Sequence, residues 1–154
     1  MTIFDKIYLT LWMWSFSFAS FIAKRKKFAL VTRMLMRFFA WQSLLIRHGR
    51  KKFSLQEVVF EWQRMFPSKE INHIKSIGND TAYAEVRVQC PLRGSGDVMT
   101  CYRMMEYDRA MLEKIGGQLV VLHSQAEPEV EICEVALKIE GANTDDLIPA
   151  HKRV

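Results

Sequence analysis

The ten residues TAYAEVRVQC, at positions 81–90, change the periodicity of this 154-residue chain from helical to alternating. Small or apolar residues at every second position alternate with tyrosine, glutamate, arginine and glutamine, as in a strand with one buried face. Residues 70–77 show a weaker pattern of the same kind, and Gly78-Asn79-Asp80 supplies turn residues between the two stretches. This part of the chain therefore predicts a β-hairpin.

After the hairpin, the sequence predicts one helix and two further strands. Ser95 or Asp97 can cap a helix that ends at Gly116-Gly117, and strands are expected at residues 118–125 and 130–140. The order β-β-α-β-β predicts an α+β domain with a small antiparallel sheet. We expect this domain to cover residues 54–140 and a loosely packed polar tail to cover residues 141–154.

Three helices are predicted before the hairpin. The third begins at Ser54, which forms a capping box with Glu57, and ends at Pro67. Residues 28–48 form the second, and an apolar run near the start of the chain forms the first. Because the α+β domain is small, we expect the N-terminal helices to complete its core.

The apolar run, residues 7–23, has no charged residue and is followed at once by four cations. As a helix it is ~26 Å long, just short of a hydrocarbon core of ~30 Å. Small residues at every fourth position favour a span packed on a partner helix, and they are Ser15, Ala19 and Ala23. A narrow polar stripe favours instead a helix lying flat on the membrane, and it contains Lys6, Thr10, Ser17 and Lys24.

Other interpretations of this run are a cleaved signal peptide and a buried helix of a soluble oligomer. Four consecutive cations stand where a small-residue cleavage site is needed, which argues against cleavage. Because these cations follow the run, the positive-inside rule predicts that the folded domain lies on the cytoplasmic side of a membrane. The three cysteines are then expected to be reduced thiols.

Charge is divided unevenly along the chain. Residues 1–53 contain eleven cations and one acid, whereas acids outnumber cations in the remainder. Aromatic residues interleave with these cations, a combination typical of the lipid headgroup region, and no nucleic-acid-binding motif is present. We therefore predict a lipid partner and no nucleic-acid partner. The predicted membrane contacts are Trp12, Trp14, Lys24, Arg25, Lys26, Lys27, Arg33 and Arg37.

The second helix, residues 28–48, is a poor candidate for a second span because Arg33, Arg37 and Arg47 share one side of it. We expect it to be an interfacial helix, or one that covers the folded domain with its apolar side.

Asp108 is the first candidate catalytic residue, because it falls inside the apolar face of the helix predicted for residues 97–115. A carboxylate at such a position is costly unless it is paired or used. The cations that could reach it are Arg87, Arg93 and Arg109. The alternative is a structural carboxylate that caps a loop or holds an arginine.

Cysteines are the other candidates: Cys90 at the end of a strand, Cys101 near a helix N-terminus, and Cys133 in the last strand. Proximity to a helix N-terminus lowers a thiol pKa, although a lone cysteine is most often a small buried hydrophobe. The cysteine spacing matches no zinc module, and His73 and His123 are the additional ligands the domain offers. A zinc site is therefore a less favoured alternative, and the cofactor is left unassigned.

The stretch that contains Cys90, Cys101, MEYDRAMLEKIGG at residues 105–117, and a later strand with Cys133 resembles the L-2-amino-thiazoline-4-carboxylic acid hydrolase-like family. It more distantly resembles small-molecule-binding domains of the 4-vinyl reductase type. The resemblance covers about residues 54–140 and implies a pocket marked by cysteines and by an acid on the central helix. The sequence departs from the family at residues 126–129, AEPE, where a glycine-rich turn is usual.

The resemblance implies hydrolytic opening of a small heterocyclic acid at a carbon–nitrogen bond. Asp108 would activate water or orient the ring nitrogen, and Cys90 or Cys101 would act as nucleophile or metal ligand. The predicted substrate-binding residues are Arg93, Arg109, Tyr102 and His123, with an arginine holding the substrate carboxylate. The alternatives are a small-molecule-binding module and a non-catalytic accessory subunit, attached to a membrane protein partner or to further copies of itself.

Overall fold

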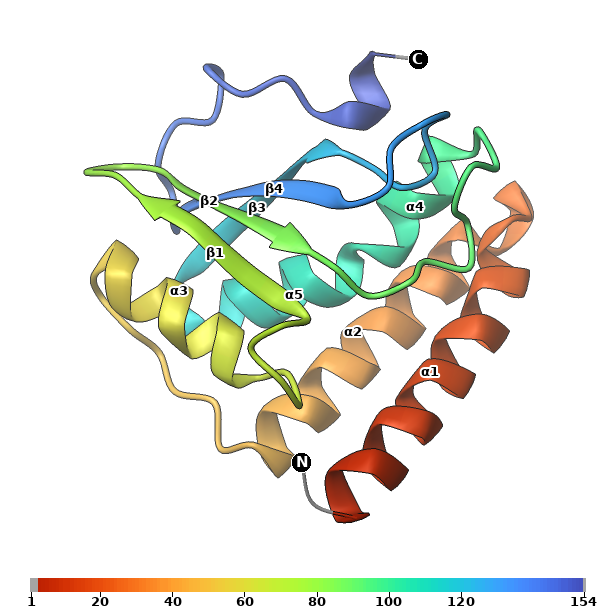
Figure 1. Ribbon diagram of the computed structural model, residues 1–154, viewed down its shortest axis with the longest axis horizontal. Coiled ribbons are helices and arrows are strands. Elements are labelled where there is room, and N and C mark those ends of the chain that lie inside the picture. Colours follow the sequence, from red (N-terminus) through yellow and green to blue (C-terminus); the bar gives the residue numbers. More distant parts are fainter. Residues whose placement is uncertain (1–2, 154) are drawn as a thin grey trace.

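The computed structural model describes residues 3–153 and shows an α+β fold with one four-stranded antiparallel sheet, in the order β1-β2-β4-β3 (Figure 1). The helices are α1 (Ile3–Ala23), α2 (Ala29–Ile46), α3 (Leu55–Arg64), α4 (Val98–Met104) and α5 (Glu106–Ile115), with short 3-10 helices η1 (Lys26–Phe28) and η2 (Ala150–Lys152). The strands are β1 (Asn72–Ile77), β2 (Ala82–Val86), β3 (Gly117–His123) and β4 (Cys133–Ile139).

The predicted hairpin is confirmed by the pairing of β1 with β2, in which Ile77 lies opposite Ala82. Ala82 and Ala84 are buried while Tyr83 between them is exposed, as the alternating pattern predicts. Strand β2 ends at Val86, so residues 87–90 belong to the loop that follows and not to the strand.

Where the sequence predicts one helix, the structure has two, because the chain leaves helical geometry at Met105. Asp97 caps α4 by accepting a hydrogen bond of 2.9 Å from the backbone N–H of Thr100. The second helix, α5, ends at Gly116, whose φ of 95° is the left-handed conformation that favours glycine. The order is thus β-β-α-α-β-β, with the break placing α4 and α5 as separate supports for the loop after β2.

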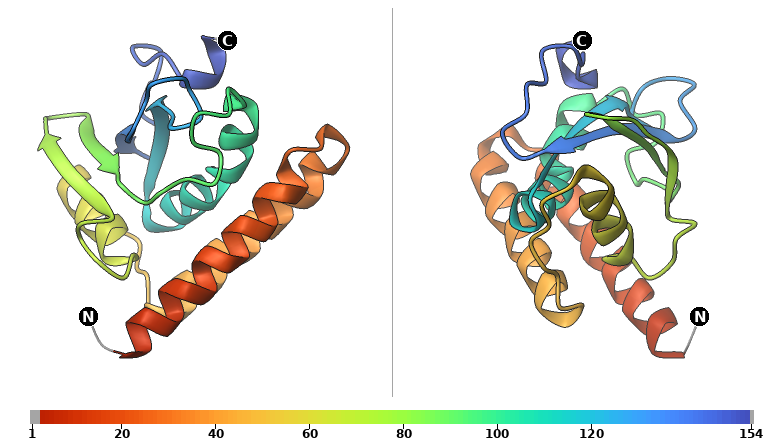
Figure 2. Two further views of the ribbon diagram at one scale, coloured as in Figure 1. Left: turned by 45° about the vertical axis from the view of Figure 1, so that its right-hand side comes forward. Right: turned by 90° about the vertical axis from the view of Figure 1, so that its left-hand side faces the viewer.

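The helices stack on one face of the sheet in two layers (Figure 2). Helices α3 and α5 pack on the sheet, and α2 packs on α5, where Tyr107 Oη donates a hydrogen bond of 2.9 Å to Ser43 Oγ. Ala19 of α1 and Met36 of α2 belong to the same buried cluster as Trp62 of α3. The prediction that the N-terminal helices complete the core is confirmed.

The C-terminal tail, predicted to be a loosely packed polar segment, is mostly exposed but is fixed to the domain at a few points. Lys138 lies in β4 with its side chain 5% exposed, and its ammonium donates to Asp146 Oδ1 at 2.7 Å and to Asn143 O at 2.8 Å. A buried cation needs such acceptors, so the tail folds back to supply them. Ala150 is buried as a consequence of this return.

Among the described residues, one helical segment, residues 26–46, is long and apolar enough to cross a membrane by length and composition. The described apolar part of the first helix is shorter, at Met13–Ala23. The sequence favours the first run, residues 7–23, as the better span, but several side chains in the first half of that run lie outside the described residues, so the two runs are not comparable on this criterion. Only Arg33 and Arg37 interrupt the central part of the second helix, so composition alone does not exclude this helix as a membrane span.

Candidate functional site

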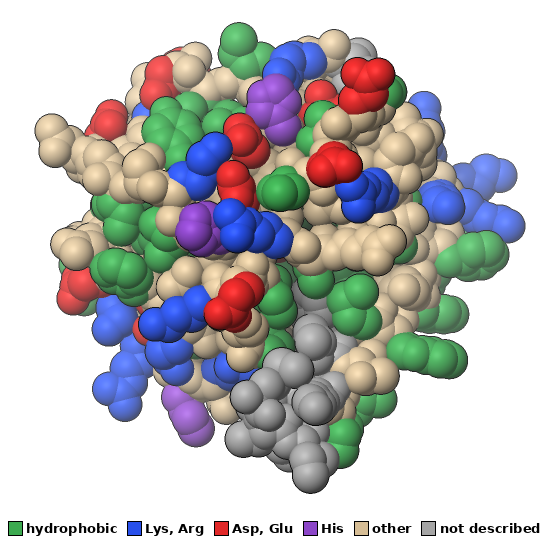
Figure 3. All heavy atoms as spheres, in the orientation of Figure 1, with side chains coloured by type: hydrophobic (Ala, Val, Ile, Leu, Met, Phe, Trp, Pro, Cys, Tyr) green, Lys and Arg blue, Asp and Glu red, His purple; other side chains and the backbone are tan. Residues whose placement is uncertain are grey.

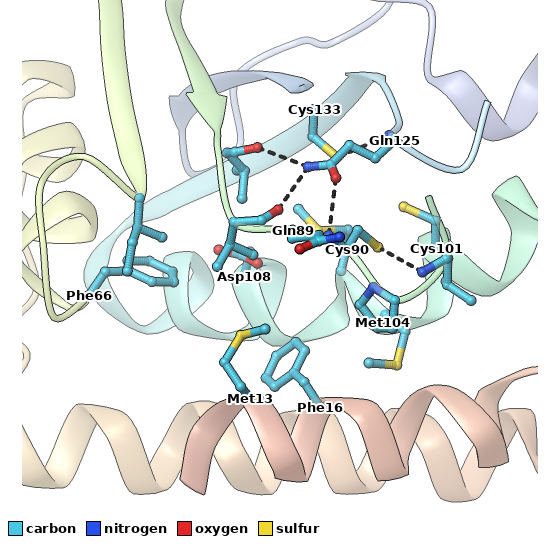
Figure 4. Close-up of a pocket in the computed structure, with 16 residues that line it drawn as sticks. Met13, Phe16, Phe66, Gln89, Cys90, Cys101, Met104, Asp108, Gln125 and Cys133 are labelled. Atoms are coloured by element: carbon cyan, nitrogen blue, oxygen red, sulfur yellow. Dashed lines mark hydrogen bonds between the residues drawn. The ribbon is translucent and has the colours of Figure 1, made fainter. Parts of the chain in front are cut away.

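A cavity of about 70 Å³ lies between α1, the loop after β2 and the α4–α5 break (Figure 4). Its walls are almost wholly apolar. The lining residues are Met13, Phe16, Phe66, Ile71, Val86, Val88, Gln89, Cys90, Pro91, Leu92, Cys101, Met104, Met105, Asp108, Gln125 and Cys133.

Asp108 is the acidic residue of this lining, and α5 holds it in a buried position, 6% exposed. Burial raises the pKa of its carboxyl to about 6, although a hydrogen bond of 3.0 Å from Trp62 Nε1 to Oδ1 opposes the rise. No lining residue carries a positive charge. With a pKa of about 6 the carboxyl group is mainly ionised at pH 7, where about a tenth of the molecules carry the proton, and in that form it offers the cavity a hydrogen-bond donor.

The three cysteines come together at the cavity. Burial raises the pKa of Cys101 to about 12 and that of Cys133 to about 11, and it also raises the pKa of Cys90. Because the thiolate is the nucleophile, thiols with raised pKa values are poor nucleophiles. Cys101 lies in the first turns of α4, but desolvation outweighs the effect of the helix N-terminus that the sequence predicts.

Gln125, which is 2% exposed, fixes the loop that forms one wall. Its Oε1 accepts a hydrogen bond of 3.1 Å from the backbone N–H of Cys90, and its Nε2 donates to Val88 O at 2.9 Å. The backbone N–H of Gln125 in turn donates to Cys133 Sγ at 3.2 Å. One amide side chain thus connects the loop after β2 to the segment before β4.

Four residues predicted to bind substrate lie away from the lining. Arg109 forms an ion pair of 3.1 Å with Glu106 and stacks on the Tyr102 ring, whose other neighbour is His151 at a centroid distance of 3.9 Å. Arg93 pairs with Glu131 at 3.3 Å. His123 ends β3, also outside the lining. Their predicted role in binding substrate stays a prediction.

The predicted membrane contacts divide into two groups. Trp14 and the four cations Lys24, Arg25, Lys26 and Lys27 are exposed. Arg33 and Arg37 instead bind acids of the domain: both reach Glu106, at 3.3 and 3.0 Å, and Arg37 also reaches Glu113 at 2.8 Å. Trp12 lies in α1, but its side chain is outside the described residues.

No group of three or more cysteine, histidine or acidic side chains that could hold a metal ion occurs among the described residues. The three thiols of the cavity therefore do not form the zinc site considered as an alternative from the sequence. A cofactor is not assigned.

Several residues that line the cavity or bind its lining were not predicted as site residues. Trp62 is fully buried outside the lining, and its indole N–H donates a hydrogen bond to Asp108. Met13 and Phe16 come from the run interpreted as a membrane segment, so nothing local marked them as part of a site. Gln125 gave no signal beyond being the polar last residue of a predicted strand.

No protein-family model matches this chain, and no curated protein and no solved structure matches it either.

Proposed function

We propose that this protein is a membrane-associated module that binds a small, uncharged, apolar molecule, or the apolar end of a longer one, in the cavity beside α1. The observation that carries the proposal is the lining itself, which gathers sixteen residues from α1, the sheet, the loops and the α4–α5 break with almost no polar surface. Apolar concave sites with a few placed polar groups are the usual form of ligand sites. Asp108 is the polar group that would orient a ligand, by accepting from a ligand hydroxyl when ionised or by donating to a ligand carbonyl when protonated.

The membrane association belongs to the same proposal. Lys24 to Lys27 follow the apolar run directly, and this order favours the cytoplasmic side for the folded domain. The cavity would then open next to the helix that meets the membrane, since Met13 and Phe16 of α1 form one of its walls.

Hydrolysis of a small heterocyclic acid is the second candidate. It is favoured by one observation, that Asp108, Cys90 and Cys101 line the same cavity. It is weakened by the raised thiol pKa values and by the absence of a lining cation for the substrate carboxylate. Ligand binding without a reaction agrees with both the apolar lining and the raised thiol pKa values, whereas hydrolysis agrees with neither.

Methionine methyl groups give a direct test, with indole as the probe. Indole should shift the resonances of Met13, Met104 and Met105 in a saturable way and leave exposed Met34 unchanged. Filling the cavity with Cys90→Phe should abolish these shifts. A matched control, Met99→Phe, adds an aromatic ring on the exposed side of α4 and should leave binding intact.

Shifts confined to Met34, or shifts that rise linearly without saturation, would contradict the proposal. Circular dichroism of Cys90→Phe shows whether this variant is folded with a filled cavity or is misfolded. The methionine shifts measured with the unsubstituted protein test the proposal independently of that variant. Turnover of a heterocyclic acid that is lost in Asp108→Asn, with the fold retained, would favour the hydrolase instead.

A further inference from the structure

Each helix of the α1–α2 hairpin carries an exposed apolar stripe in addition to its buried side. Along α1, exposed large side chains recur at alternating spacings of four and three residues, at Ile7, Leu11, Trp14, Phe18 and Phe21. The same spacings recur along α2, at Val31, Met34, Phe38, Trp41 and Leu45. The spacing of three and four residues places each set on one side of its helix.

Both stripes point away from the domain. On the helical wheel they lie opposite the buried side, which is formed by Ala19 and Ala23 in α1 and by Met36 and Ala40 in α2. The two helices form an outer layer with the rest of the chain on one side of it (Figure 2). Of the twenty large hydrophobic side chains exposed among the described residues, thirteen lie in residues 7–46. Monomeric soluble proteins rarely expose so continuous an apolar surface.

The contacts of α2 with the domain are incompatible with a helix that crosses a bilayer. Arg37 is bound to Glu106 and Glu113 of α5, and Ser43 accepts a hydrogen bond from Tyr107. A span along α2 would carry these groups into hydrocarbon or separate them. The helix can therefore meet lipid only along its outer stripe.

The C-terminal end of helix α1 is also bound to the domain. Arg103 Nη1 of α4 donates a hydrogen bond of 2.7 Å to the carbonyl of Ala23. The small residues Ala19 and Ala23, whose spacing suggested a partner helix in the membrane, are buried in the core of their own chain. Lipid cannot surround α1 while these contacts persist.

Charge identifies the surface that covers the stripes. Residues 7–46 contain no aspartate or glutamate, while Lys24, Arg25, Lys26 and Lys27 are exposed where α1 turns into α2. Figure 3 shows cationic side chains at this edge of the molecule, next to hydrophobic ones. A second copy of the hairpin would bring to this turn further cations and, from residues 7–46, no acids, so it would repel the turn and not neutralise it. Anionic lipid headgroups offer the opposite charge beside an apolar layer.

We propose that the α1–α2 hairpin docks flat on an anionic bilayer surface, with its two apolar stripes at the boundary of headgroups and acyl chains and its four turn cations on lipid phosphates. Neither helix crosses the bilayer. This inference rests on the membrane association proposed above and specifies its mode, and it does not depend on what the cavity binds.

Flotation with vesicles tests the lipid chemistry. The protein should bind vesicles of phosphatidylcholine mixed with phosphatidylglycerol more tightly than phosphatidylcholine alone, and salt should weaken the difference. Lys26→Gln with Lys27→Gln should lower the affinity for the mixed vesicles by roughly fivefold for each cation. A control pair with the same change of charge, Lys69→Gln with Lys114→Gln, replaces exposed cations of the domain and should bind as before.

The stripes have their own variant and control. Phe18→Ser with Met34→Ser should weaken binding to both kinds of vesicle, whereas Phe53→Ser, at a residue that is 84% exposed outside the hairpin, should not. Equal binding to neutral and mixed vesicles, or equal loss in the control pair of cations, would overturn the proposal. Either of these vesicle results would leave the proposed cavity function untouched, because indole binding is measured separately from the methyl resonances of the cavity methionines.

Protease protection tests the flat orientation. A tag placed before Met1 and a tag placed after Val154 should both be digested in sealed inside-out membrane vesicles. Protection of the first tag alone would show that α1 crosses the bilayer and would refute flat docking. A stable dimer without lipid that also fails to float with mixed vesicles would identify a second copy as the partner and refute it equally.

Discussion

Replacing Asp108 by asparagine should stabilise the protein at neutral pH. Burial raises the pKa of this carboxyl from 3.8 to about 6, so that the folded state binds more protons than the unfolded state between these two values. The free energy of unfolding therefore falls as the pH rises through this window. The rise in pKa corresponds to about 3 kcal/mol, which the charged carboxylate costs the folded state at higher pH.

Asparagine keeps the shape of the side chain and the oxygen that accepts the Trp62 bond, but it cannot ionise. The difference in unfolding free energy between Asp108→Asn and the original protein should thus grow by about 2 kcal/mol from about pH 4 to about pH 7.5, because part of the total is already present at pH 4. Urea unfolding followed by circular dichroism measures it. Ionisable groups common to both proteins cancel in the difference.

Asp97→Asn is the matched control, because its expected sign is opposite. Burial opposes ionisation of Asp97, but hydrogen bonds from Thr100 outweigh it and lower the pKa of this carboxyl. The stabilisation it contributes is present at neutral pH and is lost as the pH falls through its folded pKa, so this variant should be destabilised at neutral pH and less so in acid. If Asp108→Asn showed the same pH dependence as Asp97→Asn, the reasoning about burial would be refuted.

Three further outcomes are expected. Trp62→Phe should cost more at about pH 7.5 than at about pH 4, because a hydrogen bond to a charged carboxylate is worth about 1.5–3 kcal/mol and one to a neutral group about 1 kcal/mol; an equal cost at both pH values in urea unfolding would contradict this. Ser54→Ala should lower the unfolding free energy by about 1 kcal/mol by removing the cap of α3, and no loss would mean that the capping bond is not formed in solution. All three thiols should react slowly with a disulfide reagent in the folded protein and rapidly in urea, and a folded thiol that reacts at the unfolded rate would contradict its burial; the thiols are Cys90, Cys101 and Cys133.

Local signals predicted much of the fold because they act within a few residues. The Ser54 cap is formed, with the backbone N–H of Glu57 donating to its hydroxyl, and the left-handed Gly116 ends α5. The break at Met105 had no such signal. Residues on both sides of it are good helix formers, and neither proline nor glycine marks it, so the break is set by packing between distant elements.

The candidate site was predictable only where a residue conflicts with its surroundings. Asp108 was found because a carboxyl inside an apolar helix face needs an explanation, and it does lie in the cavity. Arg109 was one of three cations that could reach Asp108, and it forms its ion pair with Glu106, one turn earlier on the same helix. Gln125 binds the backbone of Cys90, thirty-five residues away in sequence, and no periodicity reports such a contact.

Helix α1 shows why an apolar run is ambiguous when only its composition is known. A membrane span is apolar all round because lipid surrounds it, and a buried helix is apolar all round because protein does. In this chain the inner side of α1, with Phe16 and Ala19, is apolar because it completes the core and the cavity. The outer side, with Trp14 and Phe18, is apolar with no protein over it. A helix with protein on one side and an exposed apolar stripe on the other has the sidedness of an interfacial helix, and that sidedness is visible only once the packing partner of each side is known.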